Sequence, residues 1–284
     1  MEVFPVFFRA ARYYLRSEWI RLATAAFAVV LYSVIIVNNL KTTPMTYEEF
    51  AAQYDRYSYI RSEKAALDRL AEREKIPREL LGDSFEEAYP VFRERHFSMF
   101  LAYTGDCAWL FTPVLAGGLA ALFLCCVFRK RHLGPLLAAG CSRGAVYLFL
   151  LISYFGFFLF IWLVAVPWCF SRYRIVPLTA GQLSCLRLLK PALLFTLLFG
   201  AAAGFFFAFL LRRPVPAFLA SVGFLFLVQL LSEWAPLPLA FIKALVNWEA
   251  DTGAGPLIAQ GCVTAAAIAA AFIGGWLCFR RQEV

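Results

Sequence analysis

The sequence predicts an all-α integral membrane protein with six transmembrane helices. Hydrophobic residues make up 62% of the 284 residues, charged residues only 16%, and the mean hydropathy is +0.68. Soluble domains are closer to half apolar and a quarter charged. Six runs without a charged residue are long enough to cross a bilayer, which takes about 20 residues. These runs are 22–40, 107–128, 144–171, 191–211, 214–232 and 252–279, and because none alternates with a strand's period, helices are favoured.

The positions of arginine and lysine predict that the N and C termini are cytoplasmic. An even number of spans puts both termini on one side, and that side is rich in cations. These are Arg9, Arg12, Arg16 and Arg21 in the arm, Arg129, Lys130, Arg131 and Arg143 in the loop 129–143, and Arg212, Arg213, Arg280 and Arg281. Cytoplasmic segments of membrane proteins are enriched in Arg and Lys, so this side is expected to be cytoplasmic. With six spans, we expect a multi-pass protein of a cell membrane, such as the bacterial plasma membrane. The loop with Arg172, Arg174, Arg187 and Lys190 departs from this rule.

Residues 1–21 read as an amphipathic interfacial arm before the first span. Aromatic residues such as Phe7, Phe8 and Tyr13 alternate with arginines, so the arm is expected to lie in the membrane interface against anionic lipid. A cleaved signal peptide fits poorly, because no small-residue cleavage site precedes Lys41. The net charge of +8 does not indicate nucleic acid as a partner, since many of the cations lie next to the spans.

The region 41–106 is predicted to be a helical extracytoplasmic insertion between the first two spans. Thr46 and Glu49 form a capping-box pattern, and apolar residues at helical spacing then predict one long amphipathic helix. A short second helix is expected from Pro77 to Gly82. A third helix should be capped by Asp83 and Glu86, and Pro90 should kink or break it.

This region has few large apolar side chains for a deep core of its own. It should therefore pack on itself, on a second copy, or on the outer ends of the spans. Two roles are open for it, an external cap that meets substrate and a plain spacer.

The loop 129–143 combines properties that do not fit an ordinary solvated loop. It opens with three cations, and Leu133, Leu136 and Leu137 then share one helical face that ends at Gly140. One interpretation is a short cytoplasmic helix that offers its leucines to a partner. The other, equally open, is a surface loop whose leucines dip into lipid headgroups.

Two further stretches indicate how the spans are arranged. Gly200 and Gly204 form a G-x-x-x-G contact pattern in the fourth span, and Gly117 and Gly118 lie in the second. Residues 233–251 contain helix-breaking prolines and two tryptophans, and they predict outer re-entrant or surface helices between the last two spans.

The chain lacks the common signatures of catalysis, so no catalytic, cofactor-binding or metal residues are expected. It contains no phosphate-binding loop of the G-x-x-x-x-G-K-[ST] type, and no charged residue inside the six runs. Its only two histidines, His96 and His132, are predicted on opposite faces of the membrane. No C-x-x-C pair occurs, and a disulfide between Cys169 and Cys185 is left open.

A few polar residues within the spans could line a pathway or tie helices together, and helix contacts are the commoner role. They are Tyr147, Gln229, Gln260 and Thr264.

The layout resembles the permease subunits of ABC-2 type ABC exporters. The shared features are the interfacial arm, six spans with both ends inside, the loop 129–143 in place of the coupling helix, and helices at 233–251. The passage Leu136-Leu-Ala-Ala-Gly-Cys-Ser-Arg143 carries most of the resemblance at the level of sequence. The insertion 41–106 is longer than in many members and resembles that of members from Gram-positive bacteria.

The resemblance implies a division of labour between subunits. A separate ABC ATPase would carry ATP and Mg²⁺, and a second permease copy, identical or not, would complete the pathway. The implied ATPase contacts are Arg131, His132, Leu133, Leu136, Leu137, Gly140 and Arg143. Two alternatives remain: a membrane scaffold or sensor that binds an external partner through 41–106 without transport, and a membrane-embedded enzyme acting on lipid.

Overall fold

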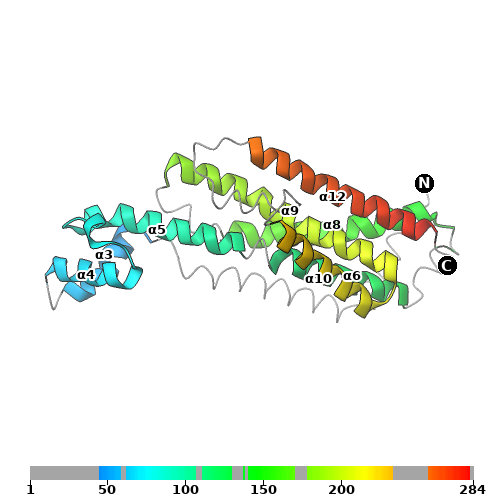
Figure 1. The fold of residues 1–284 in the computed structure, drawn as a ribbon, viewed down its shortest axis with the longest axis horizontal. Helices are drawn as coiled ribbons and strands as arrows, with labels where there is room; N and C mark the ends of the chain where they lie inside the picture. The colour runs from blue at the N-terminus through cyan, green and yellow to red at the C-terminus, as the bar shows by residue number, and fades with distance from the viewer. Residues whose placement is uncertain are drawn as a thin grey trace.

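A computed structural model describes residues 45–58, 62–106, 111–129, 137, 140–169, 178–232 and 255–281. Within these ranges the regular structure is helical, without a strand. The arm 1–21, the expected first span 22–40, the helices expected at 233–251 and most of the loop 129–143 lie outside the described residues. The described helices form two parts, a bundle of apolar helices and a group of more polar helices at one end of it (Figure 1).

Long apolar helices with α9 at their centre make up the bundle. They are α6 (Thr112–Arg129), α8 (Arg143–Cys169), α9 (Ala180–Leu211), α10 (Pro214–Leu231) and α12 (Gly255–Arg280). Helices α6 and α10 pack on one side of α9, and α8 and α12 pack on another (Figure 1). Among the described residues, four helices are long and apolar enough to cross a membrane, α6 being shorter in its apolar part. This is the composition of a membrane-embedded protein.

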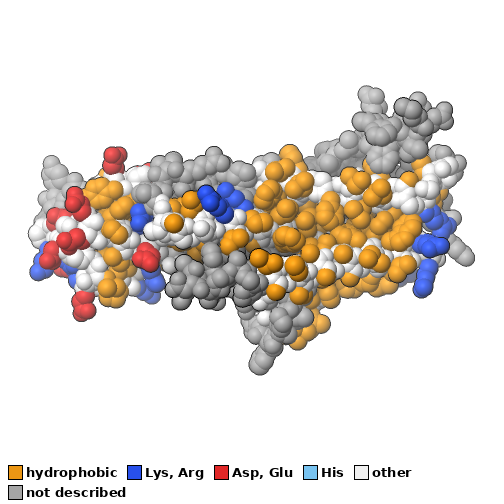
Figure 2. All heavy atoms as spheres, turned by 90° about the horizontal axis from the view of Figure 1, so that it is seen from above, with side chains coloured by type: hydrophobic (Ala, Val, Ile, Leu, Met, Phe, Trp, Pro, Cys, Tyr) orange, Lys and Arg blue, Asp and Glu red, His pale blue; other side chains and the backbone are white. Residues whose placement is uncertain are grey.

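The outer surface of the bundle is apolar, as a lipid environment requires. Figure 2 shows hydrophobic side chains covering the bundle, with cations gathered at its far end. Large exposed side chains on the outer helices include Leu148, Ile152, Phe160, Leu163, Val215, Leu219, Phe226, Leu227, Leu230, Ile258, Ile273 and Leu277.

Helix α9 begins well before the position that the charge-free run predicted. It starts at Ala180 rather than near residue 191. Thr179 begins it with a capping box, in which its hydroxyl accepts from the Gln182 amide at 3.3 Å and the Gln182 side chain accepts from the Thr179 amide at 3.1 Å. Charge ends a membrane run but does not end a helix, so the helix continues through Arg187 and Lys190. The bounds of α8, α10 and α12 lie within a few residues of the charge-free runs 144–171, 214–232 and 252–279.

Helices α6 and α9 approach until their backbones touch. A Cβ atom added to Gly204 would overlap the carbonyl oxygen of Gly117, and one added to Gly200 would lie 2.6 Å from the Cα of Pro113. The G-x-x-x-G contact face predicted at 200–204 is therefore confirmed, and its partner is the Pro113–Gly117 stretch of α6. Only residues without a side chain permit this approach.

The glycine pair on α6 also receives α10. An added Cβ at Gly117 would lie 2.5 Å from Cδ1 of Leu225, and one at Gly118 would lie 2.7 Å from the Phe218 ring. Gly117 thus touches α9 and α10 at once, which fixes α6 between them.

Four helical segments lie in residues 45–106, which we call the insertion after the expectation stated above. They are α3 (Tyr47–Ser58), α4 (Glu63–Glu74), the 3₁₀ turn η1 (Arg78–Leu80) and α5 (Phe85–Asp106). They enclose a core of their own, made of Phe50, Ala66, Leu67, Leu70, Ile76, Leu81, Phe85, Ala88, Tyr89 and Phe92. Of the three ways of packing that we considered, the described residues show two: the insertion packs on itself, and the later part of α5 packs on α9.

The single long helix expected after Thr46 is wrong, because the structure has two helices there. Helix α3 ends at Ser58, and α4 begins at Glu63 and packs against α3. In one continuous helix the apolar side chains would lie along its length without meeting one another. Folding back brings Phe50 of α3 and Leu67 of α4 into one core. Removing that apolar surface from water favours the folded-back form.

The cap predicted before α3 is confirmed, whereas the cap of α5 lies one residue later than predicted. The Thr46–Glu49 capping box is confirmed, with reciprocal bonds of 3.1 and 3.2 Å. At the start of α5 the cap is Ser84, whose hydroxyl accepts from the Glu87 amide at 3.3 Å, and not Asp83 with Glu86. The Glu87 carboxylate instead accepts from the Asp83 amide at 2.9 Å.

Pro90 was expected to kink or break the helix, and it does not break it. The helix continues through it for 22 residues in all. Neighbouring Tyr89 and Phe92 are buried in the insertion's core. Their packing holds the helix across the one backbone hydrogen bond that proline removes.

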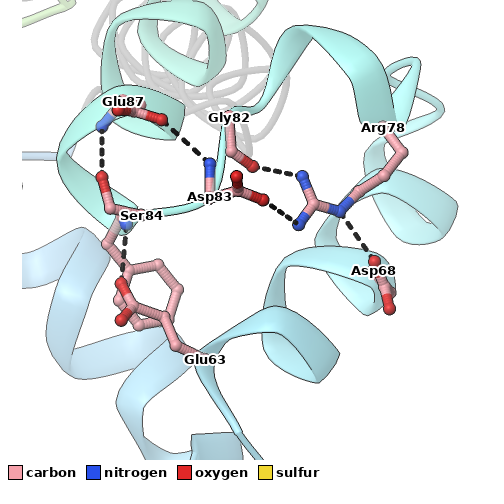
Figure 3. A network of polar contacts seen from close by, with 8 residues as sticks. Glu63, Asp68, Arg78, Gly82, Asp83, Ser84 and Glu87 are labelled. Carbon is pink, nitrogen blue, oxygen red and sulfur yellow. Dashed lines mark hydrogen bonds and ion pairs between the residues drawn. The ribbon is translucent and has the colours of Figure 1, made fainter.

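Arg78 fixes the turn between α4 and α5 (Figure 3). Its Nε donates to Asp68 Oδ1 at 2.7 Å, Nη1 donates to the carbonyl of Gly82, and Nη2 lies 4.0 Å from Asp83. Gly82 has a φ of +66°, a conformation that other residues rarely adopt. The Phe85 amide then donates to Glu63 Oε1 at 2.8 Å, which ties the start of α5 to the start of α4.

Gly204→Leu should destabilise the bundle by at least about 1–3 kcal/mol, because no void exists to accept the side chain. The matched control is Gly156→Leu on α8, where an added Cβ meets nothing within 4 Å. Thermal unfolding in detergent, followed by size-exclusion fluorescence, measures both. A Gly204→Leu protein as stable as the Gly156→Leu protein would contradict the close α6–α9 contact.

Candidate functional site

The end of the bundle farthest from the insertion carries a cluster of arginines, which we call the basic end. Here α6, α9 and α12 end and α8 and α10 begin (Figure 1). The exposed arginines are Arg143, Arg212, Arg213, Arg280 and Arg281 (Figure 2). The described residues of the bundle include no Asp or Glu to balance them. Among the described parts of the bundle, this is the strongest concentration of charge.

Local backbone structure places these arginines. Ser142 caps α8 by accepting from the Ala145 amide at 3.2 Å, which sets Arg143 at the first helical position. The Arg143 guanidinium donates to the carbonyl of Arg280 at 2.9 Å, so the start of α8 is tied to the end of α12. Arg212 ends α9 with a φ of +57°, and Pro214 then begins α10. This left-handed residue makes the turn tight.

Beneath the basic end lies an apolar cluster, which we call the basic-end cluster. Its buried members are Ala121, Leu124, Cys125, Val146, Tyr147, Leu150, Phe205, Ala208, Phe209, Ala217 and Phe279. They come from all five bundle helices. A displacement of one helix end would therefore be felt by the others, because closely packed interiors transmit strain.

Only part of the predicted partner-contact set is described. Leu137 is half-buried against the basic-end cluster, while Gly140 and Arg143 are exposed. Gly140 has a φ of +84°, and its amide donates to the Leu137 carbonyl at 3.0 Å, which closes a turn. Arg131, His132, Leu133 and Leu136 lie outside the described residues.

Tyr147 is the polar residue that joins most of the basic-end cluster together. Its ring lies 5.3 Å from those of Phe209 and Trp276 and 5.5 Å from that of Phe205, measured between centroids. Its hydroxyl donates to the carbonyl of Phe272, so it links α8 to α12. Tyr147 is thus a helix tie, the commoner of the two roles considered for it.

The other three polar residues that could line a pathway, Gln229, Gln260 and Thr264, do not lie on neighbouring helices of this chain. Gln229 is buried on α10, which packs on α6 and α9, whereas Gln260 and Thr264 lie on α12, which packs on α9 and α8. Thr264 donates to its own helix at the Gln260 carbonyl, at 3.1 Å. The side-chain oxygen of Gln260 is buried without a hydrogen-bond partner among the described residues.

The cysteines whose side chains are described are spread over several parts of the bundle. Cys185 is buried on α9, and the side chain of Cys169 lies outside the described residues, so the disulfide between the two stays open. Within the described residues, no group of three or more His, Cys, Asp or Glu side chains is placed to hold a metal ion.

Sequence reasoning overlooked His96, which the structure buries on α5 beside Glu74. The signal was present in the spacing, because Phe92 precedes it by one helical turn and Phe97 and Phe100 follow. A histidine on such an apolar face is expected to be buried.

Comparisons of the chain with protein-family models, with curated proteins and with solved structures found no match.

Tyr147→Phe should lower the free energy of unfolding by about 0.5–1.5 kcal/mol, because it removes one hydrogen bond and keeps the ring. Tyr147→Ala should cost about 3–5 kcal/mol, because it also leaves a cavity. Thermal unfolding in detergent gives both values. Wild-type stability in the Tyr147→Phe protein would contradict a structural role for the hydroxyl.

Proposed function

We propose that the chain is the permease subunit of an ATP-driven exporter of the ABC-2 type, a multi-pass protein of the cell membrane. The observation that supports this most is the basic end, where the loop 129–143 joins α6 to α8. Arginine-rich ends face the cytoplasm by the positive-inside tendency. The helical insertion, at the opposite end of the bundle, is then extracytoplasmic, and an ATPase would have a cytoplasmic surface to bind (Figure 1).

The position of Leu137 suggests how such an ATPase would act on the spans. Leu137 packs on the basic-end cluster, which contains Leu124 of α6, Phe209 of α9 and Phe279 of α12. If a partner bound the neighbouring Leu133 and Leu136, a movement of that partner would be transmitted through Leu137 to this cluster. Arg131, His132 and Arg143 would then contact the rim of the partner's groove, and Gly140 would allow the turn.

The same proposal includes a second permease copy, with the pathway between the two copies. Gln260 is the better candidate for a pathway residue, because α12 lies at the edge of the bundle, whereas Gln229 is on the buried face of α10. ATP and Mg²⁺ would bind the partner ATPase. This chain would contribute the helices that move and the loop that receives the motion, which is a two-state element biased by a ligand elsewhere.

The test is a tagged purification from the native host in mild detergent, with mass spectrometry of the proteins that accompany the chain. Wild type should bring a roughly stoichiometric ATPase that has a phosphate-binding loop. Leu133→Asp with Leu136→Asp should lose it, because two carboxylates would enter an apolar groove. These positions avoid Leu137, whose substitution would also disturb the basic-end cluster.

The matched control is Leu80→Asp, a change of the same kind at a leucine that is 59% exposed on the insertion. It should keep the ATPase. If the wild-type chain brings no ATPase even after crosslinking, or the double variant retains it fully, the proposal is wrong.

A second candidate is a scaffold or sensor that binds an external partner through the insertion. It is favoured by the insertion's own buried core and by its strongly charged surface (Figure 2). Under this function, Leu80→Asp or changes of charged residues on the insertion would abolish activity. Changes of charged residues in the loop 129–143 would leave activity unaltered.

A further inference from the structure

His96 occupies the point on α5 where packing in the insertion's core gives way to packing against α9. Phe85, Ala88, Tyr89 and Phe92 belong to the core of the insertion. Further along the same helix, Phe97, Phe100 and Leu101 belong to a different cluster, shared with Leu186 and Leu189 of α9. His96 is 8% exposed and lies between these two sets. Among the described residues it is the only histidine.

The surroundings of His96 are apolar on one side and acidic on the other. Its ring lies against that of Phe92, with centroids 3.9 Å apart. Its Nε2 lies 3.4 Å from Oε2 of Glu74, yet neither ring nitrogen makes a hydrogen bond of normal geometry with another described residue. Buried polar atoms without such bonds are uncommon and costly.

Glu74 is held in place by the end of α4. It is the last residue of that helix, and Lys75 follows in the left-handed conformation with a φ of +53°. The Ile76 amide then donates to the Ala71 carbonyl at 3.0 Å, and Ile76 is buried in the insertion's core. Arg73 from α4 lies 3.6 Å from Glu74, and Arg95 on α5 is the other described cation that acts on His96.

We propose that His96 is a proton sensor, and that its protonation loosens the contact between the end of α4 and α5 where the insertion joins the bundle. The neutral ring fits this site, since it can be buried against Phe92 without a counter-charge. A protonated ring places a charge there, with the Glu74 carboxylate as its one close acidic neighbour in the described part of the chain. The proposal does not depend on any partner ATPase.

The direction of the pH effect follows from the protonation equilibrium. Burial lowers the pKa of His96 below its usual 6.5, and Glu74 offsets this in part. The packed form therefore binds protons less readily than an unpacked form in which the ring meets water. Its stability is complete above about pH 6.5 and falls as the pH drops through that value toward the lowered pKa.

The first measurement is the titration of His96 in the full chain, labelled with ¹³C on its histidine rings, in detergent micelles. The chain has only two histidines, so a His132→Gln spectrum assigns both signals. The His96 midpoint should lie below 6.5, and Glu74→Gln should lower it further by removing the carboxylate that favours the charged ring. A midpoint at or above 6.5, or one that Glu74→Gln leaves unchanged, would overturn the proposal.

The second measurement is amide hydrogen exchange at several values of pH, in wild type and in His96→Phe. Taking the ratio of the two proteins at each pH cancels the intrinsic pH dependence of exchange. Exchange in 71–76 and 92–101 should rise in wild type relative to His96→Phe as the pH falls from 7.5 to 5, by several-fold or more. A constant ratio would show that protonation does not loosen the junction, and the proposal would fail even with a lowered midpoint.

Discussion

The contact on which the bundle depends is the meeting of two backbones, at Gly200 and Gly204 of α9 and at Pro113 and Gly117 of α6. In a membrane, helices gain little from leaving lipid for each other, so association relies on close packing. Glycine lets the two helices approach until the backbone of one fills the groove of the other. Because Gly117 also receives α10, the same few residues position a third helix.

Around this contact, α9 has different neighbours on its successive faces. Gly200 and Gly204 face α6, Phe207 packs on Phe224 of α10, and Phe205 and Phe206 face α12. The helix is therefore buried for most of its length, while α8, α10 and α12 keep apolar side chains on the outside. Pairing of rings at the basic end completes the arrangement, with Tyr147 supplying both a ring and a hydrogen bond.

The sequence predicted the parts of this structure that depend on composition along one helix. Charge-free runs located α8, α10 and α12, because charged side chains rarely lie in the hydrocarbon core. They misplaced the start of α9, because that helix begins after Thr179 and includes Arg187 and Lys190 before its uncharged part. The fold-back between α3 and α4 was also missed, because no proline or glycine marks it and the gain lies in a core assembled from distant residues.

The candidate site was predicted less completely than the fold. The loop 129–143 was singled out by its leucines and arginines, and its predicted contact residues that are described, Leu137, Gly140 and Arg143, lie at the basic end. Whether Gln229 and Gln260 share a face could not be read from the chain, because that depends on which side of α9 each helix takes. The burial of His96 depends likewise on α4 turning at Lys75, a tertiary event.

The length of α9 also determines how the molecule fits a bilayer of given thickness. Its uncharged part, 191–211, has 21 residues and spans roughly 31 Å at 1.5 Å per residue, close to a hydrocarbon core of about 30 Å. A peripheral helix can accommodate a mismatch between its apolar length and the bilayer thickness by tilting. The buried α9, fixed against α6 by backbone contact, can tilt only with the whole bundle. In a thinner membrane the lipid around the protein must therefore deform, and the energy of that deformation is borne by the surrounding annulus.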